Sequence, residues 1–558
     1  MRSGIYCVIM TMVTFCAPVM AYDWTTNPGN GSPENPYQIS TPEQLIALGA
    51  DTNVSQGFNF FALMNDIVFD PDNNSAHVFG KAVIPSFRGS LDGRGFAIEH
   101  LRISVSTYNN EPVGLIGTYG DHGACHIENL DIDNAEITVG DGFQKVGILC
   151  GLNELNIENC HVSGTIVCGT GSTQIGGLCG SNGDGFGVAG IIAHCDADVS
   201  ISSSSATGIL GECGGLCGCN EGTIAHGSAE GTIQAWSLST VGGICGQEEY
   251  GEIVSCSASV NITAQRYLGY SGGLCGQNHF GSIRFSHATG NMTSVGISTT
   301  IQCITSVGGF CGYNRQGKID SCYSSGDISC GAIEIGGDEE SGGFCGRNSG
   351  VDDEGIAHCY STGNVICGAI TNPWNKERWI GGFCGTNDAS IIHCYSVGTV
   401  VTDAADKAGF CYINYKTIED SFWDTDASGI LTAGLSGSIS GVAGKATVQM
   451  QTAATFTDSG WDFLDESANG ENDIWRMCTD GVDYPRLSWE FAENGDFACG
   501  DGVDLADLQA LADHWLTSTA IEPDTFNTAV DANGDGQIDL ADFNILSENW
   551  PSSVPIVE

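Results

Sequence analysis

An all-β fold is predicted for most of this chain, a right-handed parallel β-helix (β-solenoid) of about ten rungs. The phrase Gly-Leu-Cys-Gly recurs, clearest at 177–180, 215–218 and 273–276, with Gly-Phe-Cys-Gly at 382–385. Its copies follow one another at intervals of 27 to 39 residues, too irregular for propeller blades but suited to coils whose turns accept insertions. The stretches between copies alternate apolar and polar residues and are interrupted by Gly, Asn and Ser, as short strands are.

Two columns of small residues are expected inside this solenoid, because equivalent residues of successive rungs stack about 4.8 Å apart. The first runs through Ile116, Cys150, Cys179, Cys217, Cys245, Cys275, Cys311, Cys345, Cys384 and Cys411. The second runs through Cys160, Cys195, Cys256, Cys322, Cys359 and Cys394, each three residues after an isoleucine. Ile, Leu, Ser or Gly replaces cysteine in some rungs, which favours packing positions filled by reduced thiols. A few disulfides or metal clusters are the alternatives.

The composition restricts the possible partners. The chain has 67 Asp and Glu against 18 Lys and Arg, a formal net charge of −49. Such a field repels nucleic acid, anionic lipid and uronate-rich polysaccharide and attracts cations. Residues 1–21 have the basic start, apolar run and small-residue end of a secretory signal cleaved after Ala21. No later segment is apolar enough to span a membrane, so we expect an exported chain without a membrane span.

The repeated phrases resemble those of the GLUG-motif proteins, secreted bacterial chains named for this glycine-rich repeat. The resemblance covers about residues 110 to 425 and rests on repetition of the phrase. It implies a secreted or surface β-solenoid and carries no catalytic residue.

Before the repeats, Thr41-Pro42-Glu43-Gln44 predicts a capping box that opens a short helix covering the first rung.

A calcium-binding loop is predicted near the C-terminus. From residue 531 to 542, oxygen-bearing side chains occupy loop positions 1, 3, 5, 9 and 12, with glycine at position 6 and a backbone carbonyl at position 7. The expected Ca²⁺ ligands are Asp531, Asn533, Asp535, Gln537, Asp539 and Asp542. An earlier copy keeps Asp496, Asp501, Asp504 and Asp507 but has Ala498 where a polar ligand is expected, so its site is distorted or weaker.

These two loop-helix units, 35 residues apart, resemble a type I dockerin, an all-α, EF-hand-like module. The resemblance covers about residues 494 to 550 and implies calcium-dependent docking to a cohesin-type domain on a partner. Together these features divide the chain into a signal peptide (1–21), an N-terminal cap with the first coils (22–110), the GLUG-type repeats (111–425), a C-terminal cap or linker with an aromatic patch (426–492) and the dockerin-like module (493–551).

Aromatic residues are the candidate ligand contacts. Tyr323, Tyr360 and Tyr395 follow the second cysteine column on successive rungs, and Trp374 and Trp379 lie in the longest insertion. If the tyrosines point outward, neutral sugar rings could stack on them; if they point inward, they are core, and packing is the favoured interpretation. Four histidines before the second column, His194, His226, His358 and His393, suggest a stack of polar turns, with a metal site as the alternative.

The sequence favours a non-catalytic function. Lyases that act on uronates need Arg or Lys, which are scarce here, and a glycosidase needs two carboxyls about 5 to 10 Å apart. The richest acidic stretches, 338–340 and 352–354, read as loops at opposite ends of one strand. We therefore expect a binding or display solenoid anchored through the dockerin-like module, in a polysaccharide-degrading or cell-surface context. A glycan-cleaving β-helix enzyme and an acidic, protein-binding adhesin are the alternatives.

Overall fold

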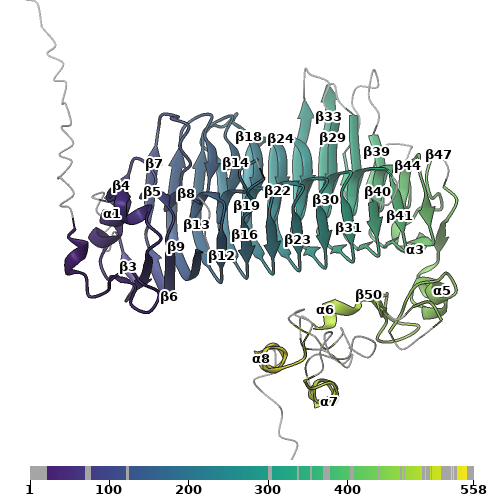
Figure 1. The fold of residues 1–558 in the computed structure, drawn as a ribbon. Helices are drawn as coiled ribbons and strands as arrows, with labels where there is room; N and C mark the ends of the chain where they lie inside the picture. Colours follow the sequence, from purple (N-terminus) through teal and green to yellow (C-terminus); the bar gives the residue numbers. More distant parts are fainter. Residues whose placement is uncertain are drawn as a thin grey trace, which may run out of the picture.

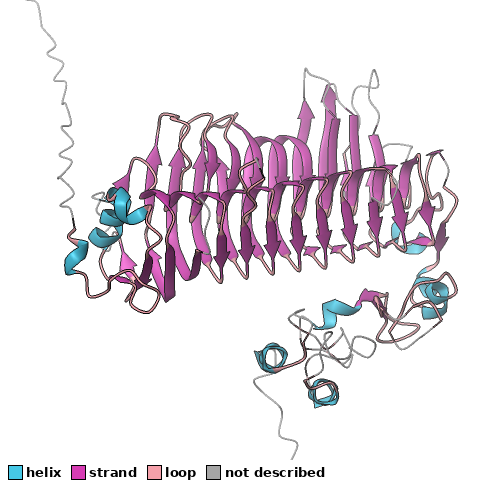
Figure 2. Cartoon of the chain, in the orientation of Figure 1, coloured by secondary structure: helices cyan, strands magenta, loops and turns pink. Residues whose placement is uncertain are grey.

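A computed structural model describes residues 22–69, 77–120, 125–185, 187–298, 304–335, 338–351, 355–368, 378–402, 407–437, 439–464, 468–470, 472–492, 495, 497, 503, 505–516, 530, 532 and 537–548. The predicted signal peptide, residues 352–354, Trp374 and six predicted calcium ligands lie outside these ranges: Asp496, Asp501, Asp504, Asp531, Asn533 and Asp535. The described chain is a parallel β-solenoid with few helices, which confirms the predicted repeat fold (Figures 1 and 2).

The cysteine phrase opens one strand in each rung, and these strands form a continuous parallel sheet. Their register pairs Ile116 with Cys150, Cys150 with Cys179 and so on to Cys411, so the predicted first column is confirmed. The strands are β5 (Ile84–Phe87), β8 (Ile116–Tyr119), β11 (Cys150–Asn153), β15 (Cys179–Asn182), β19 (Cys217–Asn220), β22 (Cys245–Glu249), β25 (Cys275–His279), β30 (Cys311–Arg315), β35 (Cys345–Ser349), β40 (Cys384–Asp388), β44 (Cys411–Asn414) and β47 (Ser436–Gly437).

The other strands form the remaining sides of the coil and pair in parallel with their counterparts in the next rung. Those that carry the isoleucines before the second cysteine column are β12 (Asn156–Glu158), β16 (Ile191–Ala193), β20 (Thr223–Ala225), β23 (Glu252–Val254), β26 (Ser282–Arg284), β31 (Lys318–Asp320), β36 (Gly355–Ala357), β41 (Ser390–Ile392) and β45 (Ile418–Glu419). The first rungs hold β1 (Tyr37–Ile39), β2 (Phe60–Leu63), β3 (Ile67–Val68), β4 (Val78–Phe79), β6 (Ser90–Glu99), β7 (Arg102–Val105) and β9 (His126–Val139).

The later rungs complete these sides with strands of very different length, from two residues to more than a dozen. They are β10 (Gln144–Val146), β13 (His161–Cys168), β14 (Thr173–Gly176), β17 (Asp196–Ser203), β18 (Ile209–Gly214), β21 (Ser228–Gly242), β24 (Ser257–Gly272), β27 (His287–Ala288), β28 (Met292–Ser298), β29 (Ile304–Gly308), β32 (Tyr323–Ser324), β33 (Ile328–Ile335), β34 (Asp338–Gly342), β37 (Tyr360–Ser361), β38 (Val365–Cys367), β39 (Arg378–Gly381), β42 (Tyr395–Ser396), β43 (Val400–Thr402), β46 (Ser421–Asp424) and β48 (Val442–Lys445).

The position before the second cysteine column is a turn in the left-handed backbone region. The histidines His194, His226, His358 and His393 have φ between 49° and 51° there, and Asn159 has φ 49°. Asparagine tolerates this region better than most residues, and a turn at the same place in each rung aligns these side chains in a column. The His194 and His226 rings stack with centroids 4.7 Å apart, so the histidines form the predicted stack of polar turns.

Both ends of the solenoid are covered. At the start, η1 (Trp24–Thr26), α1 (Pro42–Ala50) and α2 (Thr52–Ser55) precede the first long strands (Figure 1). The Thr41 side chain accepts a hydrogen bond from the Gln44 amide as predicted, but the Gln44 side chain accepts one from Ser40 rather than from Thr41. Leu45 and Leu48 of α1 are fully buried against the first rungs. At the far end, the buried Trp423 closes the interior and donates a hydrogen bond to the Ile430 carbonyl at 2.9 Å.

The chain then folds back along the side of the solenoid (Figure 1). After α3 (Thr425–Ser428), residues 446–492 form what we call the docking segment, with α4 (Thr447–Met450), α5 (Ala453–Thr457), β49 (Trp475–Arg476), β50 (Arg486–Leu487) and α6 (Ser488–Ala492). The aromatic patch of this segment was expected to close the end of the stack. It instead covers a lateral face, because that face carries the outward aromatic column described below. Two further helices follow, α7 (Leu505–Asp513) and α8 (Leu540–Glu548).

Candidate functional site

The three predicted tyrosines form one continuous ring stack on the outside of the coil. Tyr323 pairs in register with Tyr360, and Tyr360 with Tyr395, with ring centroids 5.0 Å apart at both steps. His287 extends the stack by one rung, at 4.8 Å from Tyr323. Their neighbours Cys322 and Ser324 are buried in the interior, so strand alternation directs the Tyr323 ring outward. We call this row the tyrosine column.

The docking segment covers most of the tyrosine column. Tyr360 is 5% exposed and Tyr395 1% exposed, although both point away from the interior of the coil. They share a separate apolar cluster with Phe422, Met450, Phe456, Trp461, Phe463, Trp475 and Leu487. The tyrosines are therefore packed, as favoured from the sequence, but against the returning chain rather than inside the solenoid.

Polar contacts fix the docking segment on the column. The Tyr360 hydroxyl donates to the Glu490 carboxylate at 2.9 Å, and Arg486 donates to the same carboxylate at 2.9 Å. The Trp489 indole donates to the Ser321 carbonyl at 3.0 Å, and the Tyr395 hydroxyl donates to the Pro485 carbonyl. Burial raises the pKa of Glu490, while the Arg486 guanidinium and the backbone amide of Leu487 oppose that rise.

A cavity of about 410 Å³ remains between the column and the docking segment. The tyrosine column forms one side of it, and Arg486, Tyr484 and Phe491 belong to the other. Ser325 and Thr362, each two residues after a tyrosine, add hydroxyl groups to the lining. Cavities of this size, walled by aromatic rings and a few polar groups, are typical small-ligand sites.

Of the two tryptophans predicted as ligand contacts, only Trp379 lies in the described chain. It is half-buried in β39, where it pairs in register with Glu340 of β34. It takes no part in the tyrosine column or its cavity.

Two helices stand where the dockerin-like module was predicted. Leu511 of α7 and Leu546 of α8 belong to a small apolar cluster that also includes Ile538, just before α8. Asp507 and Asp542, 35 residues apart and each the third residue of its helix, are 1% and 0% exposed. The Asp542 carboxylate accepts hydrogen bonds from the amides of Ala532 and Asp539, both at 2.7 Å. Asp539 is half-buried and Gln537 is exposed.

The interior cysteines are thiols that donate hydrogen bonds to the backbone. In the first column, Cys179 donates to the Ser181 carbonyl at 3.0 Å, and Cys345 and Cys384 make the same contact two residues on. The nine cysteines of this column are free and fully buried. Burial raises the pKa of Cys311 and Cys384 well above the ordinary thiol value, which keeps these groups protonated and unreactive. Cys478 of the docking segment, by contrast, is disulfide-bonded.

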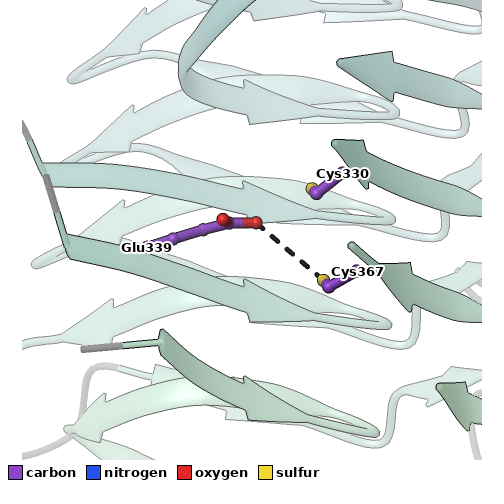
Figure 3. A group of neighbouring side chains, drawn as sticks. All are labelled: Cys330, Glu339 and Cys367. Atoms are coloured by element: carbon purple, nitrogen blue, oxygen red, sulfur yellow. Dashed lines mark hydrogen bonds between the residues drawn. The ribbon is translucent and has the colours of Figure 1, made fainter. Parts of the chain in front are cut away.

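A buried acid lies next to two of these thiols. The Glu339 side chain of β34 lies close to the thiols of Cys330 and Cys367 (Figure 3). The Cys367 sulfur is 3.9 Å from Glu339 Oε1. Three such groups within 4.8 Å of one another could hold a metal ion. Glu339 is however paired with Arg378, which lies 2.7 Å from Oε2, and the Ser341 hydroxyl donates to Oε1 at 3.0 Å. We assign the group as an internal ion pair, because its carboxylate already has donors on both oxygens.

The acidic stretch at 338–340 is therefore not the solvent loop that its composition indicated. It forms strand β34, and both Glu339 and Glu340 are fully buried. Glu340 accepts hydrogen bonds from Ser306 at 2.7 Å and from Arg347 at 3.1 Å. Burial raises the pKa of Glu340, although the Arg347 guanidinium favours the charged carboxylate and so opposes that rise. Each acid meets an arginine of the next rung or its own: Glu339 pairs with Arg378 of β39, and Glu340 with Arg347 of β35.

An asparagine column went unrecognised in the sequence. Eight of the nine cysteines of the first column are followed, three residues on, by an asparagine whose side chain is completely buried: Asn153, Asn182, Asn220, Asn278, Asn314, Asn348, Asn387 and Asn414. The Asn314 amide donates to Asn348 Oδ1 at 2.8 Å, and Asn348 donates to Asn387 at 2.7 Å. The signal was present, since the repeated phrase continues as Cys-Gly-x-Asn in most copies. We call this row the asparagine ladder.

Comparison with known proteins supports the repeat assignment. Residues 305–329 match the GLUG motif. A stretch of 162 residues is 32% identical to halomucin of Haloquadratum walsbyi, and this match covers 27% of the present chain but only 2% of halomucin.

One solved structure, of a Bacteroides ovatus protein provisionally named an immunoglobulin A1 protease, shares 21% identity over 54% of this chain and 79% of its own, with a TM-score of 0.32. No helix in the described ranges is long and apolar enough to cross a membrane. The chain is thus a parallel β-solenoid that carries the GLUG motif.

Proposed function

We propose that this chain is a secreted, non-catalytic binding or display protein. In this proposal the solenoid is a rigid scaffold, and the C-terminal module anchors it, through calcium, to a cohesin-type domain in a polysaccharide-degrading assembly or on a cell surface. The single observation that carries the anchoring role is the pair of buried aspartates, Asp507 and Asp542, at the same place in two repeated helices.

The support from Asp542 is chemical. The last ligand of such a calcium loop lies in the first turn of the helix that follows. When backbone amides of the loop hold its carboxylate, the carboxylate is oriented before the ion arrives. The Ala532 and Asp539 amides hold Asp542 in this way, and Ala532 lies in the predicted loop itself. Asp507 is buried at the equivalent place after the first loop, which supports two sites rather than one. The net charge of −49 favours cation binding throughout.

Calorimetric titration of the full chain with calcium tests the anchoring role. We expect saturable binding that Asp535→Ala weakens at least tenfold, because that substitution removes a predicted ligand carboxylate. Asp198→Ala, at an exposed position of β17, is the matched control and leaves binding unchanged. Capture of the chain by an immobilised cohesin domain should require calcium and be lost with a chelator. Identical titrations of the wild type and Asp535→Ala would contradict the proposal.

A neutral saccharide is the ligand class that the lateral cavity supports best. Aromatic faces and hydroxyl groups suit sugar rings, whereas a polyanionic chain would meet the strongly negative field. Asp483 is the acidic residue in the lining of the cavity. The nearby Glu490 lies outside that lining, and its carboxylate is already bound by Tyr360 and Arg486. A pair of free carboxyls, which hydrolysis requires, is not found in that lining, and this favours binding over cleavage.

Neutral oligosaccharides, followed by intrinsic fluorescence, test this second role. Thr362→Trp fills the cavity and should abolish the signal change, because Thr362 lies in its lining. Thr289→Trp is the matched control: Thr289 is exposed, also two residues after a member of the ring stack, and outside that lining. Equal binding by the two variants would place the saccharide elsewhere. Release of reducing ends would favour the enzyme alternative.

A further inference from the structure

The asparagine ladder has one acidic member. Glu248 lies in register between Asn220 and Asn278, so it occupies the place that asparagine holds in the neighbouring rungs. Its side chain is fully buried. A carboxylate has only acceptor atoms, whereas each amide of the ladder offers both a donor and an acceptor.

The direction of the ladder shows what is missing at this rung. Six of the eight asparagines donate their Nδ2 to the asparagine Oδ1 of the next rung, at distances of 2.7 to 2.9 Å. Asn220 follows the rule and donates to Glu248 Oε2 at 2.7 Å. At the following step, Glu248 Oε1 and Asn278 Oδ1 are both buried, and within the described chain neither accepts a hydrogen bond of ordinary geometry, although the Gly251 amide lies beside the carboxylate. Two acceptors therefore stand where the other rungs have a donor and an acceptor.

We infer that Glu248 is a neutral carboxylic acid whose Oε1 hydroxyl donates to Asn278 Oδ1 and so completes the ladder. One proton satisfies both buried oxygens at once. The ionised form would leave a charge and two unpaired acceptors in a closed interior, where neither an unpaired acceptor nor an uncompensated charge can recover the hydration that it has lost.

The surroundings favour the neutral form. Burial raises the pKa of Glu248 well above its ordinary value, and the negative side chains of Glu221 and Glu252 add to the rise. The Asn220 amide and the Gly251 amide act in the opposite direction, and Cys245 and Glu249 are the other titratable residues of β22. Gly251 and Gly281 pack closely on the carboxyl: a Cβ at Gly251 would lie 2.4 Å from Oε1, and one at Gly281 the same distance from Cγ.

The consequence is a pH-dependent link in the middle of the solenoid. The folded group holds its proton more tightly than the unfolded one, whose pKa is about 4.5. Its stabilising contribution is therefore fully present below that pH and is lost as the pH rises toward the folded pKa. The folding equilibrium constant should fall about tenfold per pH unit across this interval. This inference is independent of the calcium and saccharide proposals.

Infrared difference spectroscopy on the full chain tests the protonation directly. We expect the wild type at pH 7 to show the carbonyl band of a protonated carboxylic acid that is absent from Glu248→Gln. Glu230→Gln, at an exposed position of β21, is the control and retains the band. If Glu248→Gln fails to fold, Glu248→Met removes the same band. Identical bands in the wild type and the variant would overturn the assignment.

Stability measurements provide the second readout. Glutamine carries a permanent donor, so Glu248→Gln should complete the ladder at every pH. The ratio of its unfolding equilibrium constant to that of the wild type should therefore fall about tenfold per pH unit above pH 4.5 until the folded group ionises. Parallel pH profiles for the wild type and Glu248→Gln would show that Glu248 does not change its protonation on folding, which also contradicts the inference.

Discussion

Arg378 shows how single residues stabilise this interior. Its side chain and that of Glu339 are both completely inaccessible to solvent, and their charged atoms lie 2.7 Å apart. The guanidinium also donates to the carbonyls of Gly331 and Gly368, so it holds three separate strands or turns together. Burial lowers the pKa of Arg378, but the Glu339 carboxylate, together with Cys367 and Cys330, raises it by more, so the guanidinium remains charged. The pair therefore links neighbouring strands of these rungs and leaves neither buried charge unpaired.

Removing one member of this pair should destabilise the chain strongly. For Arg378→Met we expect a loss of about 3–5 kcal/mol in the free energy of unfolding, because Glu339 is left buried and unpaired. Chemical denaturation followed by circular dichroism measures it. Arg284→Met removes a half-exposed pair with Glu252 and should change stability by less than about 1 kcal/mol. The double variant Glu339→Met/Arg378→Met should recover much of the loss; a double variant as unstable as Arg378→Met would contradict this explanation.

At the scale of the strand and its turn, the glycines of the repeated phrase permit the rungs to approach each other. A Cβ at Gly309 would lie 2.0 Å from the Gly343 carbonyl oxygen of the next rung, and one at Gly308 would lie 2.7 Å from the Phe344 carbonyl oxygen of the next rung. No side chain fits at either place. The leucine or phenylalanine that follows fills the core, where the rings of Phe310 and Phe344 stack with centroids 4.8 Å apart. The phrase is therefore a packing unit, not a binding motif.

Alanine at Gly309 tests this explanation. The added methyl group must push two rungs apart, and we expect Gly309→Ala to lower the free energy of unfolding by about 3 kcal/mol. Gly80 is the matched control, since a Cβ there meets no atom within 4 Å and its φ is not positive. Thermal unfolding of both variants gives the comparison. Equal melting temperatures would show that the rungs are not in close contact at the phrase.

Across the whole molecule, the solenoid shows three ways of covering exposed strands and rings. The helix α1 covers the first rungs, and the docking segment lies along the side of the solenoid (Figure 1). This segment shields the tyrosine column, and Trp423 closes the far end of the interior. Open ends of a parallel sheet template pairing with other chains, so covering them keeps the solenoid from growing end to end. The tyrosine column presents the same kind of hazard, since a row of exposed rings favours association.

How far the sequence predicts this molecule depends on whether a feature repeats. The register of Cys179, Cys217 and the other column members follows from the recurring phrase, because equivalent residues must stack. The asparagine ladder repeats in the same way and was predictable from Cys-Gly-x-Asn. The Glu339–Arg378 pair was not, because its members occur once and are 39 residues apart. The return of the docking segment, in which Trp489 reaches Ser321 across 168 residues, has no periodic signal either.

The returning chain has a consequence for how the solenoid is held. The last parallel strand of the coil, β48, ends at Lys445, yet α6 contacts the coil at Ser321, several rungs earlier. The end of α6 therefore lies beside the flank of the solenoid, not beyond its tip. A tether attached after α6 would hold the solenoid from its side. Both tips would stay free, and a pulling force would act across the rungs instead of peeling them away one at a time.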